Sequence, residues 1–204
     1  MASISRNSRA AIESEFTAWL SVHQRNLIKS SRIICFDRQN TDDVLQEALA
    51  DIYQRWAKIR NHENLEAYTV RVMVSKHADL RRKWARRQTE SETTLEMADF
   101  LLESADNSDE VAERLLVQAA LKSLTAPQRA VLLLAYEYGY LLREIAEILE
   151  MQQGTVASHL ARGKAAVAQY VESVPELESR SRSQIQNSLV KDAQIIEDAQ
   201  VIEE

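Results

Sequence analysis

The sequence predicts an all-α protein with two small helical domains. Its 204 residues include only 3 Gly and 2 Pro, too few turn-forming residues for a protein made of many short strands. Hydrophobic residues make up 45% of the chain, enough to bury one core or two modest ones. In several segments they recur at spacings of three and four residues, as in amphipathic helices.

Charge is unevenly distributed along this chain. The net charge is −6, but residues 88–110 hold eight acidic residues and no basic ones. Residues 172–204 are also acidic, and the rest of the chain is basic, with a net charge of +7. We interpret residues 88–110 as a flexible acidic linker, and residues 172–204 as an extension that is disordered rather than autoregulatory or partner-binding.

Cysteine content and hydropathy argue against several classes of protein. The single Cys35 allows no internal disulfide and no cysteine-based metal cluster. The N-terminus lacks the apolar core of a signal peptide, and the apolar run 130–136 is too short to span a bilayer. No metal-ligand cluster, phosphate loop or nucleophile–base motif is present. We therefore expect a cytoplasmic protein without membrane insertion, enzymatic activity, metal or cofactor.

The N-terminal domain, residues 1–87, is predicted to begin with two helices. The first spans residues 11–36, and polar residues 37–40 end it. Thr41 is placed to cap the second helix, whose first turn carries Asp42 and Asp43. This helix buries one face, and its other face is either solvated or a docking surface. That outer face carries Asp43, Gln46, Glu47, Asp51, Gln54 and Arg55.

A polar loop, residues 57–64, leads to a helix predicted from Leu65 to Arg87. The last seven residues of this helix include five cations, with Trp84 among them. Like charges one turn apart repel each other, and a phosphate backbone would offset that repulsion. We interpret this helix end as a nucleic-acid-binding segment, where Trp84 is either a core residue or a platform for unpaired bases.

The C-terminal domain, residues 111–171, is predicted to contain four helices. Thr125 and Gln128 form a capping box with Pro127 in the first turn, and Gly139 is placed to end the helix that they start. Ala146 is small where two helices must cross closely. Gly154 separates the last two helices, and Thr155 opens the final one.

The final helix has two distinct faces. Val156, Leu160 and Val167 form an apolar face. The other face carries small and hydrogen-bonding side chains beside an arginine, which suits a helix that enters the major groove of DNA. The last two helices therefore predict a helix-turn-helix, and an ordinary helical hairpin with a polar outer face is the alternative. The second face contains Ala157, Ser158, Ala161 and Arg162.

Three blocks, taken together, resemble bacterial RNA polymerase sigma factors of the extracytoplasmic-function (ECF) group in the sigma-70 family. They are DDVLQEALADIYQRW (42–56), NLEAYTVRVMVSKHADLRRKWARR (64–87) and the segment 120–167. The resemblance covers residues 11–171. It implies sigma-2 (1–87) and sigma-4 (111–171) domains, and a subunit that directs promoter-specific initiation. It also implies core polymerase, through its β′ clamp helices and β flap, and promoter DNA as partners, and it allows an anti-sigma factor.

The resemblance implies roles for particular residues. Polymerase docking would fall to Asp43, Gln46, Glu47, Asp51 and Arg55. Reading and holding open the −10 element would fall to His62, Asn64, Tyr68, Arg71 and Ser75, with Arg81, Arg82, Lys83 and Arg86 on the adjoining phosphates. Recognition of the −35 element would fall to Thr155, Ala157, Ser158, Ala161, Arg162 and Lys164.

The sequence departs from the family pattern at several of these positions. Ser75 stands where asparagine is frequent, and Glu150 stands where the turn usually has glycine. Gln152 and Gln153 replace a common Pro–Val pair. Ala157 and His159 stand where lysine or arginine is usual, which predicts weaker phosphate anchoring by the recognition helix.

Two other functions compete with this interpretation. A stand-alone helix-turn-helix regulator of the response-regulator type needs a receiver domain of alternating strands and helices, and residues 1–110 show no such alternation. An all-helical interaction protein similar to an anti-sigma factor has no use for the basic stretch from Arg81 to Arg87.

Overall fold

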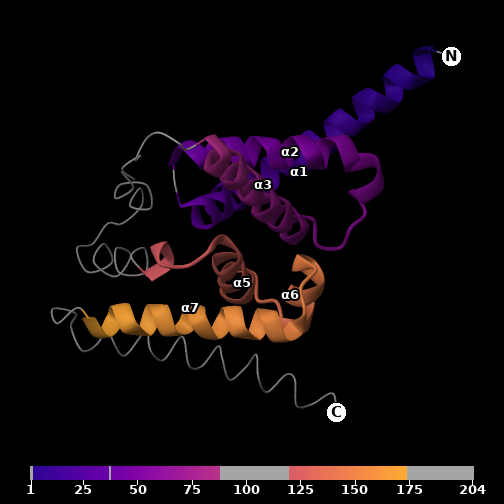
Figure 1. Ribbon diagram of the computed structural model, residues 1–204. Helices are drawn as coiled ribbons and strands as arrows, with labels where there is room; N and C mark the ends of the chain where they lie inside the picture. Colours follow the sequence, from indigo (N-terminus) through magenta and orange to yellow (C-terminus); the bar gives the residue numbers. More distant parts are fainter. Residues whose placement is uncertain (1, 37, 88–119, 174–204) are drawn as a thin grey trace, which may run out of the picture. The chain divides into compact units, whose positions relative to one another are not determined.

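The computed structural model describes residues 2–36, 38–87 and 120–173, and within these ranges it contains helices and connecting turns but no strand (Figure 1). The predicted all-α class is confirmed. The chain divides into two compact units, Met1–Thr94 and Leu95–Glu204. The proposed linker 88–110 lies outside the described residues. So does the proposed extension 172–204, apart from Glu172 and Ser173, which belong to the last helix.

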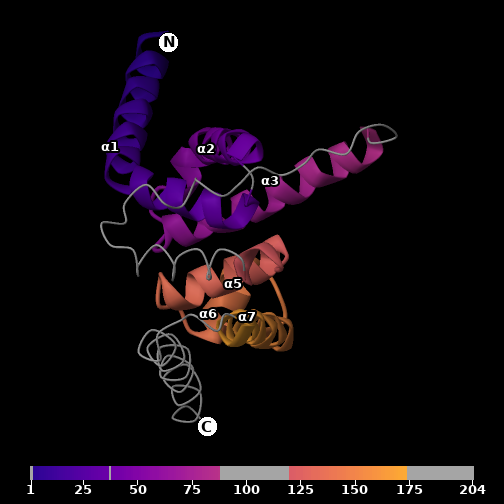
Figure 2. The same ribbon diagram turned by 90° about the vertical axis from the view of Figure 1, so that its left-hand side faces the viewer.

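The first unit consists of α1 (Ala2–Cys35), α2 (Arg38–Ile59) and α3 (Leu65–Arg87). Each of these helices packs against the other two. Leu27, Ile52 and Met73, one from each helix, are fully buried between them. The N-terminal part of α1 and the C-terminal end of α3 both project beyond this packed region (Figure 2).

The turn between α1 and α2 differs from the prediction. Helix α2 begins at Arg38, so Thr41 lies inside the helix and is only 1% exposed; its predicted role as an N-cap is wrong. The turn forms instead at Phe36, whose φ of 57° is left-handed and whose N–H donates to the carbonyl of Arg32. The Phe36 side chain is buried, and this burial offsets the strain of a left-handed non-glycine residue.

Aromatic rings join α1 to α2. Phe16 makes edge-on contacts with Tyr53 and Trp56, at centroid distances of 5.2 and 5.3 Å, and Trp19 lies 5.4 Å from Trp56. Beside these rings, Arg60 donates two hydrogen bonds of 2.8 and 2.9 Å to the Glu15 carboxylate. These bonds lower the pKa of Glu15 below its ordinary value. The residues that follow α2 are thereby attached to α1.

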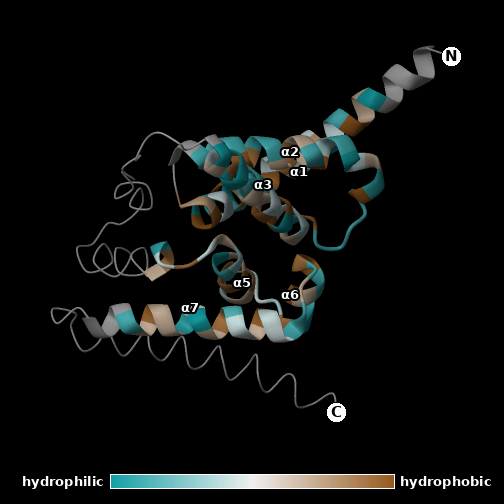
Figure 3. Ribbon diagram, in the orientation of Figure 1, coloured by the Kyte–Doolittle hydropathy of each residue, from teal (hydrophilic) through white to brown (hydrophobic). Residues whose placement is uncertain are grey.

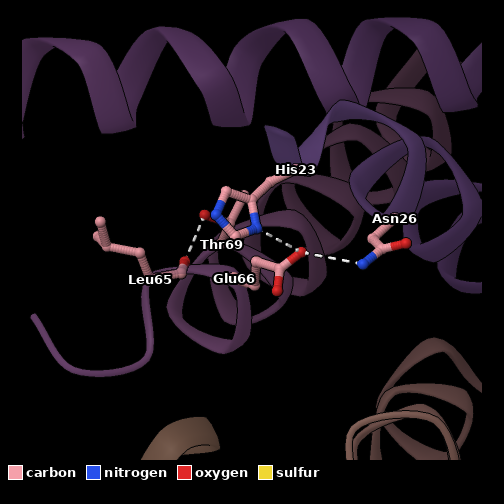
Figure 4. A network of polar contacts seen from close by, with 5 residues as sticks. All are labelled: His23, Asn26, Leu65, Glu66 and Thr69. Atoms are coloured by element: carbon pink, nitrogen blue, oxygen red, sulfur yellow. Dashed lines mark hydrogen bonds and ion pairs between the residues drawn. The ribbon is translucent and has the colours of Figure 1, made fainter. Parts of the chain in front are cut away.

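A polar network joins α1 to the first turn of α3 (Figure 4). The Glu66 carboxylate lies 3.0 Å from His23 Nδ1 and accepts a 3.3 Å hydrogen bond from the Asn26 amide. The Thr69 hydroxyl, which is fully buried, donates to the backbone carbonyl of Leu65 within α3. The network therefore fixes where α3 starts relative to α1 and leaves no unpaired hydroxyl at Thr69.

The second unit contains α5 (Ala126–Tyr136), α6 (Leu142–Leu149) and α7 (Gln153–Ser173), which pack against one another. The predicted cap of α5 is present, since the Thr125 N–H donates to Gln128 Oε1 at 2.8 Å. The Arg129 side chain is 5% exposed and donates to the carbonyls of Leu121 and Leu124. It thus ties the segment before α5 to the helix, a role that periodicity did not indicate.

The turn between α6 and α7 is centred on Glu150. This residue is left-handed, with φ 52° and ψ 45°, and the Met151 N–H donates to the carbonyl of Ala146 at 2.9 Å. The Glu150 N–H donates to the carbonyl of Glu147, which completes a Schellman turn. Gly154 lies inside α7, so the predicted break at Gly154 is wrong. Gly139 has a φ of 72° and lies in the loop after α5, which ends at Tyr136, two residues before the predicted end at Tyr138.

Helix α7 approaches α5 closely at Gly163. A Cβ atom added to this glycine would lie 2.7–2.8 Å from three atoms of the buried Leu132 side chain. Such distances are too short for carbon atoms, so the absence of a side chain permits the contact. The sequence had suggested Ala146 for a close crossing, and that residue is only half-buried.

We predict opposite effects from the same substitution at two glycines of α7. Gly163→Ala should destabilise the second unit by roughly 1–2 kcal/mol, because overpacking against Leu132 outweighs the gain in helix propensity. Gly154→Ala, with no atom within 4 Å of the new Cβ, should stabilise the unit by up to about 1 kcal/mol.

Hydrogen exchange of the α5 and α7 backbone amides measures the opening free energy of this unit separately from the first unit. Equal stabilisation by both substitutions would show that the Gly163 contact is not a constraint.

Candidate nucleic-acid interface

The outer face of α2 divides into two parts. Asp43, Gln46 and Glu47 are exposed, as expected of a docking surface. Asp51 is half-buried, and its carboxylate forms a 2.8 Å ion pair with Lys76 of α3. Arg55 is exposed and donates a 3.4 Å hydrogen bond to the Tyr68 hydroxyl of α3. The last two residues of the predicted docking set therefore contact α3.

Four residues predicted to read the −10 element lie together at the start of α3. The His62 ring lies 5.5 Å from the Tyr68 ring, and the Arg71 guanidinium lies over that ring, 4.8 Å from its centroid. Asn64 connects them, because its N–H donates to His62 Nδ1 and its carbonyl accepts from the Tyr68 N–H. Ser75 is exposed one turn beyond Arg71.

The basic end of α3 is solvent-accessible. Arg81, Arg82, Lys83 and Arg86 are exposed, whereas Trp84 is half-buried, consistent with partial packing. The Arg82 guanidinium pairs with the Asp79 carboxylate one turn earlier and lowers the pKa of that carboxyl. Arg86 Nε donates to the carbonyl of Arg82. This helix end therefore presents several cations to solvent, one of which is partly compensated by an acidic neighbour.

The two faces of α7 are arranged as the sequence predicted. Val156, Leu160 and Val167 are buried. The residues of the opposite face are exposed, apart from Lys164, which is half-buried: Thr155, Ala157, Ser158, Ala161 and Arg162. Figure 3 shows the corresponding mixture of hydrophobic and hydrophilic residues along α7.

His159 lies between the two faces of α7. Its side chain is half-buried, and its Nδ1 atom is buried without a hydrogen-bond partner. Burial, and secondarily the nearby Arg162 guanidinium, lower the pKa of His159. The imidazole is therefore neutral at neutral pH. Arg162 is then the only formal charge among the side chains of residues 155–162.

The described residues contain no group of three or more histidine, cysteine, aspartate or glutamate side chains placed to hold a metal ion. Among the same residues, no helix combines the length and hydropathy needed to cross a membrane. The described surfaces carry exposed acidic and amide groups on α2, rings and cations on α3, and a small polar face on α7.

Comparisons with known proteins identify RNA polymerase sigma factors as relatives of this chain. The family model for sigma-70, region 4, matches residues 114–167. The chain is 31% identical to the RNA polymerase sigma-E factor of Streptomyces avermitilis over 159 residues, which is 78% of this chain and 86% of that protein. It is 32% identical to the Streptomyces coelicolor sigma-E factor, over 74% of this chain and 82% of that one. It is 27% identical to the ECF sigma factor SigM of Mycobacterium tuberculosis, over 72% of this chain and 71% of that one.

A solved structure has a similar fold. It is the sigma factor RpoE of Bartonella quintana, crystallised in complex with the anti-sigma factor NepR. The alignment has a TM-score of 0.62 and covers 78% of this chain and 97% of that one, at 18% sequence identity.

The lowered pKa of His159 predicts a pH dependence of stability. Because the folded state disfavours the protonated imidazole, the unfolded state binds more protons below the ordinary histidine pKa of 6.5. The second unit should therefore lose stability as the pH falls below 6.5. The loss should stop once the pH lies below the pKa of His159 in the folded state. His159→Gln should remove this part of the dependence. Hydrogen exchange of the α7 amides at pH 7.5 and 5.5, corrected for intrinsic rates, measures the effect; an unchanged pH dependence in His159→Gln would contradict it.

Proposed function

Because this chain belongs to the ECF group of RNA polymerase sigma factors, non-enzymatic subunits that direct transcription initiation, we propose that its two units divide promoter recognition between them. The first unit docks on core polymerase and holds the −10 element open, and the second unit reads the −35 element. This role requires the chain to act in the cytoplasm, with the polymerase and the chromosome.

The cluster around Tyr68 is the observation that carries this proposal. Its aromatic ring is flanked by His62 and Arg71 and lies at the start of a helix that ends in exposed cations. Aromatic rings stack on unpaired bases, and cations hold the adjoining phosphates. Strand separation then follows from differential affinity, because binding only the unpaired bases shifts the duplex toward its open state.

Polymerase docking is proposed for the exposed part of α2. Asp43, Gln46 and Glu47 lie on successive turns, and no hydrogen bond or ion pair to α1 or α3 engages their side chains in the described residues. Acidic and amide groups of this kind suit the β′ clamp helices, with the β flap as the partner of the second unit. The Bartonella sigma factor was solved with an anti-sigma factor. We propose an inhibitor of that class as a further partner here.

Recognition of the −35 element is proposed for the exposed face of α7. Small side chains at Ala157 and Ala161 allow the helix to approach the major groove closely, and Ser158 and Arg162 supply hydrogen-bond donors for base edges. Thr155 and Lys164 are proposed to contact the flanking phosphates. With His159 neutral, this helix carries little charge for non-specific anchoring, so most of the phosphate affinity falls to α3.

In vitro transcription tests this proposed division of labour. The purified chain is added to core RNA polymerase with candidate promoters, starting with the DNA upstream of its own coding sequence. A transcript that requires both the chain and intact −35 and −10 elements is the expected result. Transcription that depends on the chain but tolerates replacement of the −35 element would show that α7 does not read it.

Substitution of Arg162 tests the recognition helix. If Arg162 contacts a base edge, Arg162→Ala should weaken promoter binding by about 1–3 kcal/mol and relax selectivity at one −35 base pair. Lys122→Ala removes an exposed cation from the same unit and is the matched control for charge. Binding to a set of single-base −35 variants is the measurement; uniform weakening on all of them would make Arg162 a phosphate contact instead.

A further inference from the structure

Two side chains of α2 reach across to α3. Asp51 and Arg55 lie one turn apart on α2, and they contact Lys76 and Tyr68, two turns apart on α3. The order of the contacts is reversed along the two helices, so the helices run antiparallel here. These two α2 residues therefore lie at the contact between α2, which is proposed to dock on polymerase, and α3, which is proposed to bind the −10 element.

The contact made by Arg55 acts on the orientation of one ring. Its Nη1 atom donates to the hydroxyl at the far end of Tyr68, while Arg71 lies over the ring face and His62 lies beside the ring. A phenol ring attached to a helix can rotate about its first two side-chain bonds. A bond to the hydroxyl and a contact on the face together restrict both rotations. The contacts come from α2, the loop after it, and α3.

We propose that Arg55 is a positioning residue for promoter opening: it holds the Tyr68 ring in the orientation that receives an unpaired base, instead of binding polymerase with the rest of the α2 outer face. This proposal rests on the proposed function of Tyr68 at the −10 element. It removes Arg55 from the docking set predicted from the sequence. The exposed Asp43, Gln46 and Glu47 stay in that set, while the half-buried Asp51 is paired with Lys76.

The placement of Arg55 favours this role over docking. Its guanidinium is already engaged by a neutral hydroxyl, which leaves its charge uncompensated beside the ring that would receive a base. A positive charge at that point also attracts the phosphate that accompanies the base. Arg71, the second cation on the same ring, would contribute in the same way.

A double-mutant cycle tests the proposal in the assembled holoenzyme. Arg55→Ala, Tyr68→Phe and the double variant are compared with the parent chain on a promoter that the parent transcribes. Tyr68→Phe keeps the ring and removes only the hydroxyl. Two quantities are measured: the affinity for core polymerase, and the rate of open-complex formation followed by permanganate reactivity of unpaired thymines.

Each single substitution should slow opening by about three- to tenfold, the change expected for one net hydrogen bond. The double variant should be no slower than Arg55→Ala alone, because both substitutions remove the same contact. Affinity for core polymerase should change less than twofold. Lys58→Ala, which removes an exposed cation from the last turn of α2, is the control for charge. Asp43→Ala is the control for loss of docking.

Two results overturn the proposal while leaving the proposed function in place. One is a loss of core affinity in Arg55→Ala comparable to that in Asp43→Ala. The other is a double variant whose slowing is the product of the two single effects. A different result, unchanged opening in both Tyr68→Phe and Tyr68→Ala, would instead reject the role of Tyr68 at the −10 element and the proposal built on it.

Discussion

The antiparallel packing of α2 on α3 is the constraint on which both surfaces of the first unit depend. Apolar residues of the two helices, such as Val44, Ile52, Val70 and Met73, are buried in the same core with α1. With those faces buried, the polar outer face of α2 lies beside the start of α3. The proposed docking surface and the Tyr68 ring proposed to bind a base are therefore attached to one rigid pair of helices, and neither can move far without disturbing the core.

In the second unit, the proposed recognition helix α7 is oriented by different contacts. The Schellman turn at Glu150 sets the direction in which α7 leaves α6, and the missing side chain of Gly163 allows α7 to lie close against Leu132 of α5. Both devices act on the backbone. The exposed side chains from Thr155 to Arg162 take no part in them, so those residues can change with the promoter while the orientation of the helix stays the same.

Much of this arrangement could be predicted from apolar periodicity and capping residues. The bounds of α3, the buried face of α7 and the Gln128 cap were predicted and are present. Periodicity identifies the face that a helix buries, but it does not identify the partner that packs there. The contacts Arg55–Tyr68, Asp51–Lys76 and Glu15–Arg60 join residues 13 or more positions apart and could not be read from local spacing. The Thr41 cap failed for a related reason, since burial of Phe36 moved the turn toward the N-terminus.

The pairing of Arg82 with Asp79 changes how the proposed DNA-binding end of α3 behaves in salt. A phosphate that binds Arg82 must displace the Asp79 carboxylate, and the half-buried Asp79 then attracts a cation from solution. Protein binding releases counterions from DNA, and this release raises the entropy. Capture of a cation by Asp79 cancels part of that gain. The four exposed cations therefore bind DNA as if they were fewer than four. Asp79 competes most effectively with a phosphate that has few other contacts to the protein. An intramolecular anion of this kind shortens the time spent on arbitrary DNA and leaves a promoter, with its additional contacts, at an advantage.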